Sequence, residues 1–290
     1  MHLRSIAWQA QASTALFVLL WSSGAIFSRW GLDHASAFVF LVLRFALALA
    51  VLLAIGLARR RWLPDPGTRW QVAACGLLLI GGYSSCYFLA LDHGVTPGVL
   101  ATVLGAQPVL TLVLVERRFA PARLAGLGLA LAGLVLVVYD SIALARMSPA
   151  GTGFALAALA CMTAGAIAQK RVDQPPAQVL PLQYGVSLLL CAALLPSQPL
   201  RLEVSMGLAV ALLWLGVVIS VVATLLLYRM IQSRNLVNVT SLFYLVPAGT
   251  ALLDWLVLGN RLAPAAIAGM LAILAGLVLV FRAASQPAVR

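Results

Sequence analysis

Ten long apolar runs follow one another along this chain, and each is long enough to cross a lipid bilayer as a helix. Crossing roughly 30 Å of hydrocarbon takes about 20 helical residues. The runs are continuously apolar rather than alternating, which favours helices over a β-barrel. We therefore predict an all-α integral membrane protein with ten transmembrane helices and short connections. The runs cover residues 12–30, 36–58, 70–92, 97–116, 121–139, 150–170, 177–196, 206–228, 237–258 and 263–282.

The composition excludes an ordinary water-soluble domain. Charged residues make up 9% of the 290 residues and hydrophobic residues 63%, whereas about a quarter of a typical soluble domain is charged. A bilayer solvates apolar surface directly, so an integral membrane protein needs few charges. The lipid bilayer is therefore an expected partner.

Two stretches of the chain are nearly identical. Residues 132–138 read AGLVLVV, and residues 275–281 read AGLVLVF. Prolines precede both stretches at similar distances, namely Pro108 and Pro121 in the first case and Pro247 and Pro264 in the second. Pro247 follows Pro108 by 139 residues, and Pro264 follows Pro121 by 143 residues. The chain is therefore interpreted as a doubled unit of about 140 residues.

The doubling divides the chain into repeats 1–145 and 146–290. Each repeat contains five predicted spans, and an odd number of crossings places the two copies in opposite orientations. We therefore predict two inverted five-helix repeats around a central cavity.

The basic residues give the orientation. The net charge is +11. With the amino terminus in the cytoplasm, fourteen Lys and Arg fall inside and four outside, as the positive-inside rule requires. We expect both termini in the cytoplasm, an inner (plasma) membrane location and no nucleic-acid partner. The inner group is Arg4, Arg59, Arg60, Arg61, Arg69, Arg117, Arg118, Arg123, Lys170, Arg171, Arg229, Arg234, Arg282 and Arg290; the outer group is Arg29, Arg146, Arg201 and Arg261.

No motif for a cofactor, a metal or catalysis stands out. The four cysteines form no CxxC pair and fall in or beside predicted spans, which favours buried apolar packing. His2, His34 and His93 lie at span ends, so we expect no intramembrane enzyme. The chain has no P-loop, and we expect no direct use of ATP.

Four segments resemble the EamA branch of the drug/metabolite transporter superfamily. The ninth-span motif of that branch runs roughly Leu-x-Tyr-Leu-x-Pro, then Leu-Gly-Glu-Arg-Leu-x-Pro. Asn260 stands in place of the motif's Glu, whereas the first copy carries Glu116-Arg117. The matching segments are Leu242-Phe243-Tyr244-Leu245-Val246-Pro247, Leu258-Gly259-Asn260-Arg261-Leu262-Ala263-Pro264, Trp21-Ser22-Ser23-Gly24 and Leu43-Arg44-Phe45.

The resemblance covers essentially the whole chain and implies a carrier that exports small metabolites by alternating access. Among such carriers the chain looks most like the YddG-type exporters of amino acids, aromatic ones included. Carriers of phosphorylated or nucleotide sugars and lipid flippases are the alternatives. A phosphate carrier needs several Lys or Arg in its cavity, and only Arg44 lies within a span. The oligomeric state is left open, and a monomer is compatible with the sequence.

Polar faces on the third and eighth spans are candidates for the cavity wall. Tyr83 and Tyr87 lie four residues apart and share a helix face. Ser220 and Thr224 belong to a polar stripe at intervals of four on the eighth span, with Gly216, Tyr228 and Gln232. The alternative is helix packing, since small polar residues mediate close contacts in membranes.

The fourth and ninth spans carry prolines at matching positions. A proline within a span frees a carbonyl group and bends the helix, and bends at corresponding places in two repeats mark a transporter's binding site. Gln107 and Tyr244, close to Pro108 and Pro247, are therefore candidate substrate residues. The alternative is a structural kink.

Trp21, Ser22 and Trp214 lie away from the expected membrane interfaces, so they are also candidate substrate residues. Arg44 is costly within a span, by about 2.5–3.5 kcal/mol for a central Arg. It attracts a carboxylate or has a structural role, and the sequence favours the structural or gating role, together with Pro108 and Pro247. No acid falls at a midplane, and Asp254 lies near the outer end of its span. We therefore expect facilitated diffusion.

Overall fold

A computed structural model describes residues 2–116, 120–139, 148–258 and 263–284. All long elements in these ranges are helices, and the one strand-like feature there is an isolated bridge between Ala35 and Leu202. The motif residues Arg117, Asn260 and Arg261 lie outside the described residues, as does the side chain of Asp254.

Nine helical spans in the described ranges are long and apolar enough to cross a membrane. The remaining predicted run, the fifth (121–139), corresponds to a shorter apolar helix, α7, of 17 residues. Elements of the first half are α1 (His2–His34), α2 (Ala37–Ala58), α3 (Arg69–Gly76), η1 (Leu77–Gly82), α4 (Tyr83–Asp92), α5 (Pro97–Leu104), α6 (Gln107–Val115) and α7 (Pro121–Val137).

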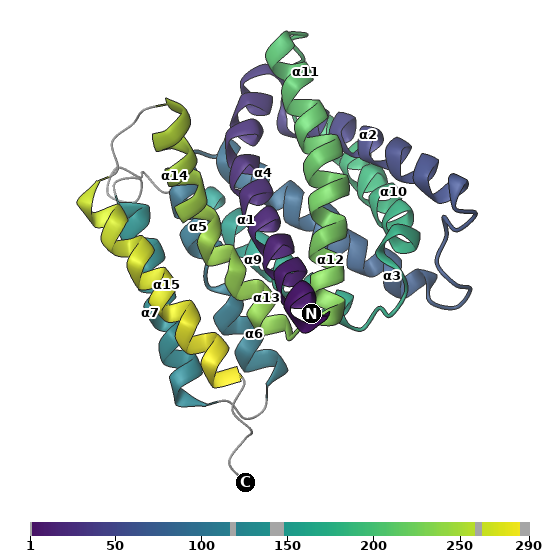
Figure 1. The fold of residues 1–290 in the computed structure, drawn as a ribbon. Coiled ribbons are helices and arrows are strands. Elements are labelled where there is room, and N and C mark those ends of the chain that lie inside the picture. Colours follow the sequence, from purple (N-terminus) through teal and green to yellow (C-terminus); the bar gives the residue numbers. More distant parts are fainter. Residues whose placement is uncertain (1, 117–119, 140–147, 259–262, 285–290) are drawn as a thin grey trace.

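The second half repeats this order of elements (Figure 1). Its elements are α9 (Pro149–Lys170), α10 (Pro176–Leu194), η2 (Leu195–Ser197), α11 (Met206–Leu213), η3 (Trp214–Ala223), α12 (Thr224–Ser233), α13 (Leu236–Ser241), η4 (Leu242–Tyr244), α14 (Leu245–Leu258) and α15 (Pro264–Ala284).

Side-chain caps and prolines fix several helix starts. Thr96 and Ser148 accept hydrogen bonds from backbone N–H groups three residues later, at 3.4 and 3.0 Å, and a proline follows each. A proline fits the first helical turn because the N–H that it lacks has no partner there. These signals begin α5 and α9 at the same face of the molecule.

Four spans contain irregular turns at corresponding places in the two halves. The third and eighth spans include the π-helical segments η1 and η3. The fourth span is divided into α5 and α6, and the ninth into α13, the 3-10 turn η4 and α14. Pro108 and Pro247 both lie in the first turn of the later helix, so each follows the break instead of bending a continuous helix.

The helices run between two faces of the molecule. We call the face where α1 begins and α15 ends the near face, and the face where α2 begins and α14 ends the far face (Figure 1). Large apolar side chains remain exposed around the bundle, including Trp70 and Leu271, which are 81% and 63% exposed. Such an apolar exterior suits contact with lipid.

Helices α7 and α15 pack side by side at one edge of the bundle (Figure 1). A Cβ atom at Gly133 would lie 2.6 Å from the carbonyl oxygen of Gly269, and one at Gly126 would lie 2.8 Å from that of Gly276. Because the later glycine of α7 faces the earlier glycine of α15, the two helices are antiparallel. Glycine at these four positions allows the two backbones to meet.

Candidate functional site

A cavity of about 410 Å³ lies between helices of the two halves. Its wall is mainly apolar and aromatic, with a few polar side chains and one charged side chain, Arg44. The residues that line it include Trp21, Ser28, Arg44, Tyr83, Ser84, Tyr87, Phe88, Pro97, Gly98, Gln107, Val137, Val138, Met162, Leu215, Ile219, Phe243, Val246, Pro247 and Thr250.

The cavity extends from the middle of the bundle to the far face. Pro97 and Gly98 begin α5 at the far face, and Val137 ends α7 there, and all three line the cavity. Gln107 and Pro247 mark its depth, because they lie at the breaks in the fourth and ninth spans.

Aromatic rings close the deep end of the cavity. The rings of Trp21 and Phe243 are 5.5 Å apart, edge to face, and both line the cavity. Phe17 lies beneath them, 5.1 Å from Trp21 and 5.3 Å from Phe243, and is fully buried. Edge-to-face packing of this kind gives a rigid apolar floor.

Arg44 reaches the cavity wall from the far-face half of α2. Its Nε donates a hydrogen bond to the Ser220 hydroxyl at 3.0 Å. Tyr83 and Tyr87 line the same cavity from α4, with ring centroids 5.8 Å apart. The two predicted tyrosines and the one cation of the wall are thus brought together.

Gln107 begins α6 and is 1% exposed. Its backbone carbonyl accepts a bond from Thr111 at 2.8 Å, but its side-chain oxygen is buried without a hydrogen-bond partner among the described residues. A buried polar atom without a partner costs about 1–3 kcal/mol. Since the residue lines the cavity, a ligand can supply the missing partner.

Two predicted site residues lie in a seam beside the cavity, where α1 packs on the second half. The Ser22 hydroxyl donates to the carbonyls of Val18 and Val246 at 2.7 and 3.0 Å. Trp214 donates from its ring nitrogen to Ser23 at 2.8 Å. Its ring stacks on Phe27 at 5.1 Å. The structure therefore places Ser22 and Trp214 in helix packing and not in the cavity wall.

The polar stripe of the eighth span also faces neighbouring helices. Ser220 accepts from Arg44, Thr224 lies 3.4 Å from the Tyr184 hydroxyl, and Tyr228 donates to Gln183 at 2.8 Å. The π-helical turns of η3 change the register of this span, because the backbone N–H of Thr224 donates to the carbonyl of Ile219, five residues back. Leu215 and Ile219 line the cavity from η3 instead.

Tyr244 points away from the cavity. It is fully buried in a second apolar cluster with Leu112, Leu127 and Ile273, beside α7 and α15. The 3-10 turn that ends at Tyr244 rotates the chain, so that the next residues along, Val246 and Pro247, line the cavity. Pro108 is likewise buried and lies outside the wall.

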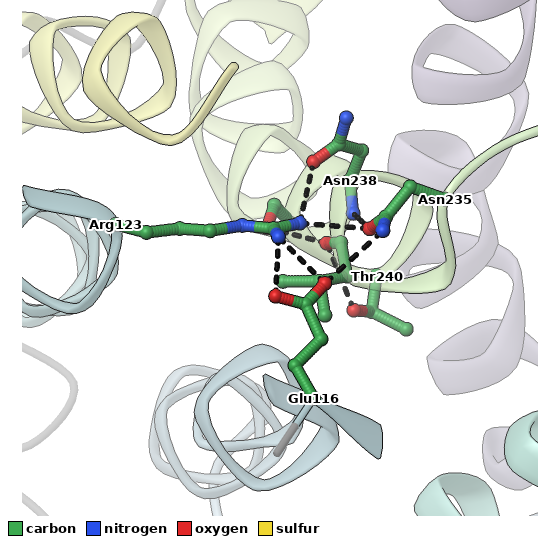
Figure 2. A network of polar contacts seen from close by, with 7 residues as sticks. Glu116, Arg123, Asn235, Asn238 and Thr240 are labelled. Atoms are coloured by element: carbon green, nitrogen blue, oxygen red, sulfur yellow. Dashed lines mark hydrogen bonds and ion pairs between the residues drawn. The ribbon is translucent and has the colours of Figure 1, made fainter. Parts of the chain in front are cut away.

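A polar network joins the two halves at the near face (Figure 2). The Arg123 guanidinium donates to both carboxylate oxygens of Glu116, each at 2.5 Å. Its other terminal nitrogen donates to the side-chain oxygens of Asn235 and Asn238, at 2.7 and 3.0 Å. Asn235 in turn donates to Glu116 at 3.1 Å. Arg123 is 5% exposed, so water screens these bonds little.

Further bonds at the near face involve the second half. Arg234 donates to the hydroxyls of Thr14 and Ser13 on α1, at 2.8 and 3.4 Å. The Lys170 ammonium donates to three backbone carbonyls at the end of α12, those of Ile231, Gln232 and Arg234. The near face is thus closed by hydrogen bonds where the far face has the cavity.

The EamA-like transporter family model matches the chain twice, over residues 10–139 and 149–282. The chain belongs to this family. EamA-like proteins are membrane transporters of small substrates, so this chain is a multi-pass membrane transporter. The offset of 139 residues between the starts of the two matches equals the spacing of Pro108 and Pro247.

Further comparisons place the EamA-like chain among known folds. No curated protein sequence matches it. One crystal structure superimposes with a TM-score of 0.78 at 23% sequence identity, over 93% of this chain and 98% of the other. That likeness shows a shared fold.

Sequence reasoning missed several residues of this EamA-like chain. Phe243 forms the cavity floor with Trp21, and Phe17 supports both rings from beneath. The spacing of four between Phe17 and Trp21 was the available signal. Thr250 lines the wall one turn after Val246, which accepts its hydroxyl at 3.0 Å. The bonds between Arg123 and Asn235 left no sequence signal, because 112 residues separate them.

Proposed function

We propose that this chain is a secondary transporter that exports small metabolites, above all amino acids including aromatic ones, by alternating access. The observation that carries the proposal is the contrast between the two faces. A cavity between the halves reaches the far face, while the network of Arg123, Glu116, Asn235 and Asn238 joins the halves at the near face. Rocking of one half against the other would exchange these states.

The proposal includes ten spans in two inverted repeats. Helix α7, the fifth in chain order, completes the set of ten; its 17 residues rise about 26 Å at 1.5 Å per residue, close to the thickness of the hydrocarbon core. Its contacts with α15 support the inversion. Gly126 and Gly133 correspond to Gly269 and Gly276 at an offset of 143, and each pairs with the other's counterpart. Paired elements related by a half-turn meet in this reciprocal way.

The connections between spans support the same symmetry. At the far face the backbone of Ser36 donates to Arg201 at 3.0 Å, which joins the turn after α1 to the connection before α11. At the near face Gln174 donates to Thr68 at 2.7 Å, which joins the turn after α9 to the connection before α3. In both pairs, the turn between the first and second spans of one repeat meets the connection between the second and third spans of the other repeat.

We place the near face in the cytoplasm and the protein in the inner (plasma) membrane. The described near-face elements carry the basic residues that the positive-inside rule assigns to the cytoplasm, among them Arg59, Arg60, Arg61, Arg171 and Arg229. The structure then represents an outward-facing state in which the cytoplasmic side is closed.

The cavity chemistry favours amino acids over the alternatives. Its volume suits one small molecule, and Trp21, Tyr83, Tyr87 and Phe243 offer ring surfaces to an apolar or aromatic side chain. Phosphorylated sugars would need more than one cation, and among the described lining residues Arg44 is the one cation. We propose no enzymatic activity and no cofactor. Proton coupling is not part of the proposal, because no described lining residue is a carboxylate.

Counterflow in proteoliposomes tests the function. Vesicles loaded with an unlabelled amino acid should transiently accumulate the same labelled amino acid above its equilibrium level, whereas vesicles loaded with a sugar phosphate should only equilibrate it. Labelled phosphosugars and fluorescent lipids are tested in the same vesicles, and movement of either in place of amino acids would refute the substrate class. Detection of the two termini on opposite sides of the membrane would refute the proposed topology.

A further inference from the structure

Arg44 carries the one charge in the described cavity wall, and no described side chain neutralises it. Neither ion pair in the described residues involves Arg44; those pairs are Arg29–Asp33 and Glu116–Arg123. Ser220 is its one hydrogen-bond partner there, through Nε. A guanidinium has five N–H donors, so the donors on its two terminal nitrogens remain for a ligand.

An unpaired cation inside a membrane protein is unfavourable unless it meets water or an anion. A purely structural Arg would use its terminal nitrogens to join helices, as Arg123 does with Glu116 and Asn235. Arg44 instead has its Nε bonded to Ser220 while its side chain lines the cavity. This arrangement holds a cation ready for an anionic ligand.

We propose that Arg44 is the residue that binds the carboxylate of a transported amino acid, and that Ser220 is its positioning residue. The inference rests on the proposed amino-acid transport and names the group that selects the substrate. One guanidinium matches one carboxylate in charge and in two-donor geometry. The aromatic wall receives the side chain, and neutral polar groups of the wall, such as Gln107 and Thr250, are available to the ammonium.

The experiment compares compounds that differ in one group. Counterflow of labelled L-phenylalanine is measured in the presence of three unlabelled competitors. These are L-phenylalanine, L-phenylalaninamide, which lacks the carboxylate, and 3-phenylpropionate, which lacks the ammonium. The readout is the half-inhibitory concentration of the amide divided by that of the amino acid. In the wild type we expect a ratio of about ten or more, from charge-assisted hydrogen bonds.

Arg44→Gln should bring this ratio close to one, because the amide side chain does not distinguish a carboxylate from its amide by charge. Arg44→Lys should keep a preference for the carboxylate but bind it more weakly, since Lys lacks the planar fork. Ser220→Ala should lower the ratio in part, and Ser220→Thr, which keeps the hydroxyl, should restore it. Arg29→Gln makes the same change at an exposed position and should leave the ratio unchanged.

A ratio that stays at the wild-type value in folded Arg44→Gln overturns the proposal. If Arg44→Gln elutes as an aggregate in size-exclusion chromatography, Arg44→Lys and Ser220→Ala test the proposal in its place. Wild-type inhibition ratios in both of these variants would also overturn the proposal. A wild type that shows no counterflow of any amino acid instead refutes the proposed substrate class. If the wild-type protein transports L-phenylalanine but does not distinguish it from its amide, the role of Arg44 in carboxylate binding is refuted while the proposed substrate class stands.

Discussion

Gly126 of α7 and Gly276 of α15 meet backbone to backbone. A Cβ atom on Gly276 would lie 2.5 Å from the carbonyl oxygen of Gly126, and one on Gly126 would lie 2.8 Å from that of Gly276. A backbone oxygen cannot turn aside as a side chain can, so any larger residue must push the two helices apart. The contact thus fixes how closely the ends of the two halves approach.

We expect Gly276→Ala to lower stability by about 1–3 kcal/mol, the cost of overpacking a tight contact. Gly128→Ala is the matched control, because a Cβ atom there meets nothing within 4 Å. The control should be neutral or slightly stabilising, since Ala is the better helix former. Thermal unfolding in detergent measures both, and equal shifts would contradict the packing described here.

The near-face network should set the balance between outward-facing and inward-facing states. Arg123→Ala removes the donor that joins Glu116 to Asn235 and Asn238. Losing hydrogen bonds between charged and polar groups should shift this balance by about 1–3 kcal/mol. We expect the near face to open more often.

A single cysteine placed near Gln107 in a cysteine-free background reports this opening. Its labelling rate by a reagent applied from the near face should rise in Arg123→Ala. Arg229→Ala is the control, since Arg229 lies exposed on the same face and is not a member of the network of Arg123, Glu116, Asn235 and Asn238. Equal labelling rates in the two variants would show that the network does not hold the near face closed.

We expect the side chain of Gln107 to lower the stability of the fold and to contribute to transport. Gln107→Leu keeps the side-chain volume approximately and removes a buried oxygen that has no partner among the described residues. The variant should be more stable by about 1–3 kcal/mol and should transport amino acids more slowly. Thermal unfolding and counterflow on the same preparation measure the two effects. A loss of stability together with full transport would show that Gln107 supports the fold.

Transport should not depend on a proton gradient. Among the described lining residues there is no carboxylate to carry a proton. We therefore expect labelled amino acid to equilibrate across the membrane with or without an imposed pH difference. Uphill accumulation that an ionophore abolishes, and that Asp254→Asn removes, would contradict this and would make Asp254 the coupling residue.

The sequence alone determined the class of protein and its outline. Long apolar runs predict helical spans because the bilayer core holds no water, and a helix satisfies the backbone N–H and C=O groups within one segment. The paired prolines and the stretches 132–138 and 275–281 predicted a doubled chain, and the family matches at 10–139 and 149–282 agree with it. Six singled-out residues line the cavity: Trp21, Tyr83, Tyr87 and Gln107, predicted as substrate residues, and Arg44 and Pro247, predicted as structural or gating residues. Their roles stay predictions.

Only the tertiary structure decided which polar residues face the cavity and which join helices. Ser220 was predicted from regular helical spacing and Tyr244 from its closeness to Pro247, but a π-helical segment and a 3-10 turn change the register of their spans. Trp214 turns to Ser23, which is 191 residues away in the chain. Periodicity describes one helix, whereas the direction of a side chain depends on partners that folding brings from elsewhere.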